Sequence, residues 1–194
     1  MEAVIIDLII TDIMFLKKTH FLFFILTFSV IVNSSCSNSE KNQPSNSQEI
    51  KLVYSAIDDF YDLEKQDFKP FYIDEEREVL AIDAAIFKDA FAAAEVLFTG
   101  TSGTYELTFY TMTEIDGEST YRILINNKLV EEFQNPETEN DFELIPHFIE
   151  SIEVRNGDKI QIEFNSHSNG KIPEDGAFAF SRGRWKGIEL VKIK

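Results

Sequence analysis

The sequence predicts an all-β fold, a two-sheet antiparallel β-sandwich that spans residues 50–194. Two observations support this prediction. Apolar and polar residues alternate with a period of two along several short segments, which is the pattern of strands with one buried face. Runs of Gly, Asn, Asp and Pro separate these segments as turns do, and many short strands at such spacing are typical of a sandwich or a barrel.

One segment near the start of this domain departs from the alternation. Residues 84–93 contain clustered alanines together with the spaced Phe87 and Phe91. This composition indicates either one or two helical turns or a packed loop, followed by a strand at 94–98.

The clearest strand patterns follow Gly103. Each has apolar residues on one face and polar residues on the other, and the segments are TYELTFYTM (104–112), STYRILIN (119–126), IESIEV (149–154), DKIQIEF (158–164) and KGIELVKIK (186–194). The tetrapeptide RNGD (155–158) stands between two of these strands and is a strong hairpin signal, and INNKLV (125–130) indicates a second hairpin.

Residues 1–35 have the pattern of an export signal and are left out of the fold prediction. An apolar run at 21–32 follows Lys17 and Lys18, and this run is too short for a comfortable transmembrane span. Residues 1–13 carry acids, whereas the stretch MFLKK that begins at Met14 suits a signal start. We therefore expect Met14 to be the initiator.

Cys36 is the only cysteine, so the chain contains no internal disulfide. Its surroundings, VNSSCSNSE, resemble a bacterial lipoprotein signal of the Bacteroidetes type, although Asn33 stands where that family prefers an aliphatic residue. The resemblance implies a lipid on Cys36, a flexible tether over 36–49 and an exported domain anchored by that lipid to the outer membrane or the cell surface. The alternative is an ordinary cleaved signal with a chance cysteine.

The charge and the motifs exclude several classes of function. A formal net charge of −16 argues against nucleic acid, which requires a basic face, and against simple adsorption to anionic lipid. The sequence has no HxH, HExxH or GxSxG pattern and no phosphate-binding loop. We therefore expect a protein without catalytic activity.

Three stretches, taken in order, carry a resemblance to a known family: GTYELTFYTMTEIDGESTYRILINNKLV (103–130), VRNGDKIQIEFNSHSNG (154–170) and RGRWKGIELVKI (182–193). They resemble the galactose-binding-like jelly rolls, which include the carbohydrate-binding modules of bacterial polysaccharide-degrading enzymes. The resemblance implies sugar binding in loops at one end of the sandwich, near the start of the last strand. It also makes a structural calcium ion the one candidate cofactor.

Arg182, Arg184 and Trp185 occupy that place in this sequence. A tryptophan face can stack on the C–H groups of a sugar, and guanidinium groups suit the carboxylate or sulfate of an acidic polysaccharide. Two alternatives remain open. By alternation with Ile188 and Leu190, Trp185 falls on the outward face of the last strand, and it could be a core residue if a bulge at a neighbouring glycine turns it inward. The arginines could pair with acids of the chain.

Asn165, His167 and Asn169 belong to a second polar stretch, FNSHSNG (164–170). Such neutral donors and acceptors suit sugar hydroxyls, but they suit equally a loop that satisfies its own backbone. The acidic turn TEIDGEST (113–120) supplies oxygen ligands of the kind that calcium prefers. A solvated turn explains it as well, because the spacing of a calcium loop is absent.

These observations predict a non-catalytic cell-envelope lipoprotein that binds extracellular polysaccharide. The main alternative is a module that docks onto a protein complex of the envelope through an edge strand or an apolar face. A small polysaccharide hydrolase or lyase is a further alternative. The exposure of Trp185 and its two arginines distinguishes sugar binding from docking.

Overall fold

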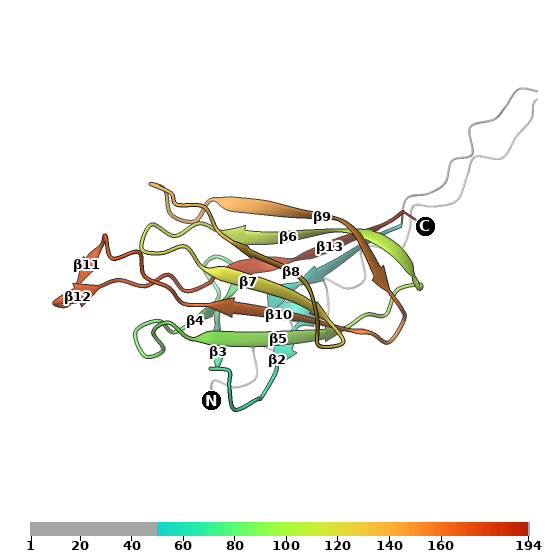
Figure 1. Cartoon of the computed structure of the whole chain (residues 1–194), viewed down its shortest axis with the longest axis horizontal. Helices are drawn as coiled ribbons and strands as arrows, with labels where there is room; N and C mark the ends of the chain where they lie inside the picture. Colours follow the sequence, from blue (N-terminus) through green and yellow to red (C-terminus); the bar gives the residue numbers. More distant parts are fainter. Residues whose placement is uncertain (1–49, 194) are drawn as a thin grey trace, which may run out of the picture. The chain divides into compact units, whose positions relative to one another are not determined.

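Two antiparallel sheets pack face to face in the computed structural model, which describes residues 50–193 (Figure 1). The first sheet has the strand order β3 (Phe71–Asp74), β4 (Val79–Ile82), β13 (Trp185–Lys192), β6 (Gly103–Met112) and β9 (Leu144–Val154), and β1 (Lys51–Ser55) also pairs with β13. The second has the order β2 (Tyr61–Asp62), β5 (Phe91–Leu97), β10 (Lys159–Asn165), β7 (Thr120–Ile125) and β8 (Lys128–Gln134). We name them the β13 sheet and the β10 sheet. The predicted all-β sandwich is confirmed.

Alternate residues of the predicted strands face the core between the two sheets. The inward positions are buried in β6 (Tyr105, Leu107 and Phe109), in β10 (Ile160, Ile162 and Phe164) and in β13 (Ile188 and Leu190). All five strand patterns after Gly103 therefore have the period and the buried face that the sequence predicts.

The predicted hairpin at 125–130 forms, because β7 pairs with β8 and Asn126 and Asn127 have φ values of 51° and 64°. These two left-handed residues make the type of tight turn that suits a hairpin.

The turn at 155–158 also forms, but not as a hairpin. The N–H of Asp158 donates to the Arg155 carbonyl at 2.9 Å, yet β9 pairs with β6, whereas β10 pairs with β5 and β7. The prediction was wrong because a tight turn specifies a reversal of the chain and not the sheet that receives the next strand.

Residues 83–90 form turns and loop, and not a helix. β5 begins at Phe91, three residues earlier than the sequence predicts, because Ala92, Ala94 and Val96 alternate inward and are buried. The short helix α1 (Ala56–Asp59) lies elsewhere and was not predicted.

A small hairpin of β11 (Pro173–Glu174) and β12 (Ala177–Phe178) projects from one end of the sandwich (Figure 1). Within residues 50–193, no helix has both the length and the apolar character needed to cross a membrane.

Candidate functional site

Trp185 lies in the core and not on the surface. Its side chain is 0% exposed, and its ring packs edge-on against Phe60 with ring centroids 4.9 Å apart. Phe109 and Phe164, which come from opposite sheets, lie with their centroids 5.4 and 5.7 Å from the indole. The prediction that Trp185 contacts a ligand is therefore wrong, and the alternative core role is correct.

A β-bulge at the start of β13 turns the indole inward. The register with β6 shifts by one residue between Trp185 and Gly187, and the extra residue brings Trp185 to the same side as Ile188. Gly187 has a φ of 152°, and a Cβ there would collide with the carbonyl oxygen of Tyr54 in β1. Only glycine fits this approach of the two strands.

Arg184 is buried beside two carboxylates. Its Nε donates to Asp74 Oδ2 at 2.9 Å, and its Nη1 donates to Glu114 Oε1. The Glu114 carboxylate also accepts the backbone N–H of Arg182 at 2.9 Å and that of Arg184 at 3.3 Å. We name Asp74, Glu114 and Arg184 the ion cluster. The predicted ligand role of Arg184 is wrong, because internal pairing uses its guanidinium group.

The two acids of the ion cluster differ in their pKa. Burial raises the pKa of Glu114 to about 7, although the charge of Arg184 and the backbone N–H groups oppose this increase. Burial also acts to raise the pKa of Asp74, but the hydrogen bond and the charge of Arg184 outweigh it and lower that pKa. Asp74 is therefore the constant counter-ion of Arg184, and Glu114 can gain a proton near neutral pH.

Asn165 and Asn169 join loops of the chain to one another. Asn165 Oδ1 accepts the backbone N–H of Thr120 at 2.6 Å. Asn169 Nδ2 donates to the Ile115 carbonyl at 3.0 Å and to Glu118 Oε1 at 3.2 Å. The structure therefore supports the interpretation of this stretch as a loop that satisfies its own backbone.

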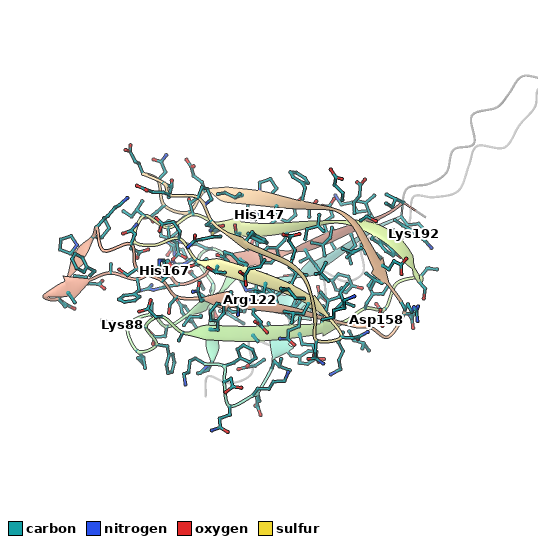
Figure 2. The ribbon with its side chains drawn as sticks, in the orientation of Figure 1. Lys88, Arg122, His147, Asp158, His167 and Lys192 are labelled. Carbon is teal, nitrogen blue, oxygen red and sulfur yellow. The ribbon has the colours of Figure 1, made fainter. Side chains whose placement is uncertain are left out.

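His167 and Arg182 are partly exposed, as are Asn165 and Asn169. The His167 side chain is 38% exposed, with Nδ1 lying 3.7 Å from Asp89 Oδ1. Figure 2 shows His167 at the end of the sandwich that carries the β11–β12 hairpin. Because Trp185 and Arg184 are buried, the structure does not bring the six predicted residues together into one exposed site.

The acidic turn 113–120 does not fit a calcium ion. Arg184 and two backbone N–H groups use the Glu114 carboxylate, and Asn169 donates to Glu118. Burial raises the pKa of Asp116, and the nearby Asp141 raises it further. Calcium requires several ionised oxygens directed to one point, and no group of three or more His, Cys, Asp and Glu side chains between residues 50 and 193 is placed to hold a metal.

The outer face of the β10 sheet carries an array of polar side chains that the sequence analysis did not identify as a site. One row crosses the sheet from β2 through β5 to β10, and a second row crosses from β10 through β7 to β8. We name this array the polar face, and it consists of Tyr61, Glu95, Arg122, Glu132, Lys159, Gln161 and Glu163. Figure 2 shows Arg122 midway along the sandwich, well away from His167.

Hydrogen bonds organise the polar face into two groups. In the first group, Glu95 Oε1 accepts the Tyr61 hydroxyl at 2.9 Å and the Lys159 ammonium at 2.7 Å. In the second group, Arg122 donates to Glu132 at 2.5 Å and to Glu163 at 3.5 Å. These mutual bonds hold the side chains in place before any ligand arrives.

Gln161 lies between the two groups. Its Nε2 donates to Glu163 Oε1 at 2.8 Å, and its residue is 2% exposed. Its Oε1 is buried and has no hydrogen-bond partner among residues 50–193. A buried carbonyl oxygen without a partner costs about 1–3 kcal/mol, so Gln161 is the position on this face where an added donor would stabilise the protein most.

Two aromatic rings lie on the β2–β5 side of the sheet that carries the polar face. Tyr61 is 50% exposed, and the Phe91 ring centroid lies 4.5 Å from Arg122 Cζ. Tyr61 lies opposite Glu95, and the strand from Glu95 to Phe91 extends for about 13 Å. A cavity of about 320 Å³, lined by residues 62–65 and 68–70, adjoins this side of the sheet.

The sequence contains the polar residues but not their arrangement. Gln161 and Glu163 alternate with buried residues, and so does Arg122, which predicts that all three face away from the core. The alternation along one strand does not say which strands are neighbours. The pairing of β10 with β5, which brings Glu95 beside Gln161, is the information that only the structure supplies.

The chain is similar in sequence to a curated protein and aligns with several solved structures. No family model matches the chain. A protein of Formosa agariphila, named Uncharacterized protein P23, is 35% identical over 117 residues, which make up 59% of this chain and 26% of that protein. The chain therefore spans about a quarter of the length of this curated relative.

Several solved structures align with this chain at low sequence identity. The CBM36-1 domain of a multidomain xylanase from the hindgut metagenome of Trinervitermes trinervoides aligns with 73% of this chain and 96% of its own, at 9% identity and a TM-score of 0.44. A family 35 carbohydrate binding module from Clostridium thermocellum aligns with 73% of this chain and 97% of its own, at 15% identity and a TM-score of 0.44. An insecticidal crystal protein, Cry2Aa, gives 18% identity and a TM-score of 0.47 over 73% of this chain and 21% of its own.

Proposed function

We propose that this domain is a non-catalytic module that binds polysaccharide and that the polar face is its binding surface. The observation that carries the proposal is the array itself. Carboxylates, a guanidinium, an ammonium, an amide and a phenol come from five strands and bond to one another on the outer face of the sheet, and the Phe91 ring packs beside the guanidinium. The end of the sandwich near Trp185 is not part of the proposal.

Two properties of a sugar chain suit this surface. Each sugar hydroxyl both donates and accepts a hydrogen bond, and the polar face offers both kinds of group. The exposed ring of Tyr61 offers flat apolar area to the C–H groups of a sugar ring. The charges of Arg122 and Lys159 are matched by acids within the face, so we propose that the chain bound here is neutral.

We further propose that the domain is exported and anchored to the outer membrane or cell surface through a lipid on Cys36. The support is the sequence around Cys36, which lies outside the described residues. Many anchored copies at one surface would bind a repetitive polysaccharide strongly even if each shallow site binds weakly.

A second candidate function is docking onto a protein of the cell envelope, which the edge strand β9 favours. Phe148 in β9 is 75% exposed, and Leu144 is 49% exposed on the same side of that strand. In the described part of the chain, β9 pairs with β6 on one side, and its other edge faces no strand. An apolar patch beside an open edge is typical of a protein contact.

Three variants separate the two candidates. Gln161→Leu removes, with little change in volume, the buried amide that holds Glu163 in place. Tyr61→Ala removes the exposed ring, and Phe148→Ala removes the apolar patch of the other sheet. We expect the first two to weaken binding to a neutral polysaccharide about tenfold, or about 1.4 kcal/mol. We expect Phe148→Ala to leave this binding unchanged. Affinity electrophoresis against a panel of neutral polysaccharides measures the effect, and thermal unfolding verifies that each variant is folded.

The same measurements can reject the proposal. If Phe148→Ala weakens binding while Gln161→Leu and Tyr61→Ala do not, the polar face is not the binding surface. If the unchanged chain binds no polysaccharide in the panel, the sugar-binding function itself is rejected and docking is favoured.

A further inference from the structure

A groove between the edge strands β8 and β9 lies apart from the polar face. Its volume is about 680 Å³, which is within the usual size of small-ligand sites. The partly buried Ile125 and Val130 and the buried Ile152 contribute its apolar lining. Asp158 also lines it, and Figure 2 shows Asp158 at the end of the sandwich opposite the β11–β12 hairpin.

Hydrogen bonds between two turns fix the rim of this groove. Asn126 Nδ2 donates to Asp158 Oδ1 at 2.8 Å, and the Asn126 N–H donates to the Lys159 carbonyl at 2.9 Å. In return, the Lys159 N–H donates to Asn126 Oδ1 at 3.0 Å. The β7–β8 turn and the β9–β10 turn are thereby held against each other, so the groove is formed before any ligand binds.

Two cations of the groove form no direct ion pair. Lys128 and Arg155 both line it, and neither side chain takes part in an ion pair or a hydrogen bond within residues 50–193. The chain has 34 acids and only 18 lysines and arginines. In so acidic a protein, two unpaired cations in one cavity are available to a ligand.

The two acids that line the groove do not neutralise these cations by contact. Asp158 accepts hydrogen bonds from Asn126 Nδ2 and from the Arg155 N–H at 2.8 Å, and these bonds, together with the nearby charge of Arg155, lower its pKa. Glu153 alternates with Ile152 and Val154, which face the core, so its side chain leaves on the outer side of the β13 sheet.

We propose that this groove binds an anionic unit of a saccharide, with Lys128 and Arg155 holding its carboxylate or sulfate group. The planar guanidinium of Arg155 can donate two parallel hydrogen bonds to such a group. The apolar residues of the groove contact the C–H face of the sugar ring. This groove is separate from the polar face, for which we propose a neutral polysaccharide as ligand. Either proposal can therefore fail without the other.

The test compares four probes with the intact chain by isothermal titration calorimetry. The probes are an oligogalacturonate, a sulfated galactan oligosaccharide, the uncharged galactan oligosaccharide and polyglutamate. We expect at least one of the two anionic oligosaccharides to bind. We expect Lys128→Gln and Arg155→Gln each to weaken that binding at least about tenfold, because each removes one of the two charges that hold the anion. The anionic oligosaccharide whose binding these variants weaken shows whether the bound group is a carboxylate or a sulfate.

Two control variants make the result specific. Lys88→Gln removes the same charge at the end of the sandwich opposite Asp158 (Figure 2) and should change the affinity less than about twofold. Gln161→Leu should leave the anionic probes unaffected, because it changes only the polar face. The proposal is overturned if neither anionic oligosaccharide binds, if Lys88→Gln has the same effect as Arg155→Gln, or if polyglutamate binds as tightly as the oligosaccharide.

Discussion

At the scale of single residues, Gly187 decides where the only tryptophan of the chain points. The alternation of the last strand predicts correctly that Ile188 and Leu190 face inward. It cannot predict the bulge, because the bulge depends on the close approach of Tyr54. Tyr54 lies in β1, which is far from β13 in the sequence but pairs with it in the sheet. The same parity argument therefore succeeds for the two aliphatic residues and fails for Trp185.

This role of Gly187 predicts a specific loss of stability. Gly187→Ala places a Cβ against the Tyr54 carbonyl, so β1 and β13 must separate, and we expect the free energy of unfolding to fall by about 3 kcal/mol. Gly170 also has a left-handed φ of 69°, but a Cβ there meets no atom within 4 Å, so Gly170→Ala should cost only about 1 kcal/mol. Urea unfolding of both variants measures the difference, and equal losses would show that the contact with Tyr54 is unimportant.

At the scale of elements, the ion cluster connects β3, the loop after β6 and the segment before β13. Asp74, Glu114 and Arg184 come from these three places, and the sequence gives no reason to choose these two acids among 34. Pairing of an arginine with acids of the chain was an open alternative in the sequence. The identity of the partners was not predictable, because it follows from the order of the strands.

The raised pKa of Glu114 predicts how stability depends on pH. Between the usual value of 4.5 and the folded value of about 7, the folded protein binds more protons than the unfolded chain, so its stability falls as the pH rises. The stabilisation that the raised pKa of Glu114 provides is complete below pH 4.5 and is lost as the pH rises through about 7. Glu114→Gln cannot titrate, so the wild type should lose about 3 kcal/mol relative to this variant over that range.

Urea unfolding at several pH values between 4 and 8 tests this dependence. Glu106→Gln provides the matched control, because it removes the same charge at an exposed position of β6, and it should not abolish the loss of stability that the wild type shows between pH 4.5 and 7. A difference between wild type and Glu114→Gln that does not change with pH, or that changes in favour of the wild type as the pH rises, would contradict the assignment.

At the scale of the whole molecule, the sequence predicts the class of fold but not the assembly of its sheets. The strand period and the turn residues lead to an antiparallel sandwich, and the structure has one. The error at 155–158 shows the missing information: β9 and β10 follow each other in the chain but lie in opposite sheets. The polar face depends on which strands are neighbours, so the sequence could not predict it. The predicted site at the end of the sandwich was wrong for Trp185 and Arg184, because the bulge and the ion cluster bury them.

The proposed lipid anchor makes a prediction for the whole chain. In a bacterium that processes lipoproteins, the chain should incorporate a labelled fatty acid and partition with the membrane, because several acyl chains hold a protein there almost irreversibly. Cys36→Ser should abolish both properties, and Ser34→Ala should change neither. Labelling that persists in Cys36→Ser, or an unlabelled wild-type chain, would contradict the anchor.

The most direct test of the central claim is to map the contact surface of a neutral oligosaccharide by nuclear magnetic resonance, titrating it into the isotope-labelled chain. Binding by the polar face predicts that the backbone signals of β5, β7 and β10 shift most, together with the side-chain amide of Gln161. Shifts that concentrate instead on β9 around Phe148, or on the loops around His167 and Arg182, would contradict it.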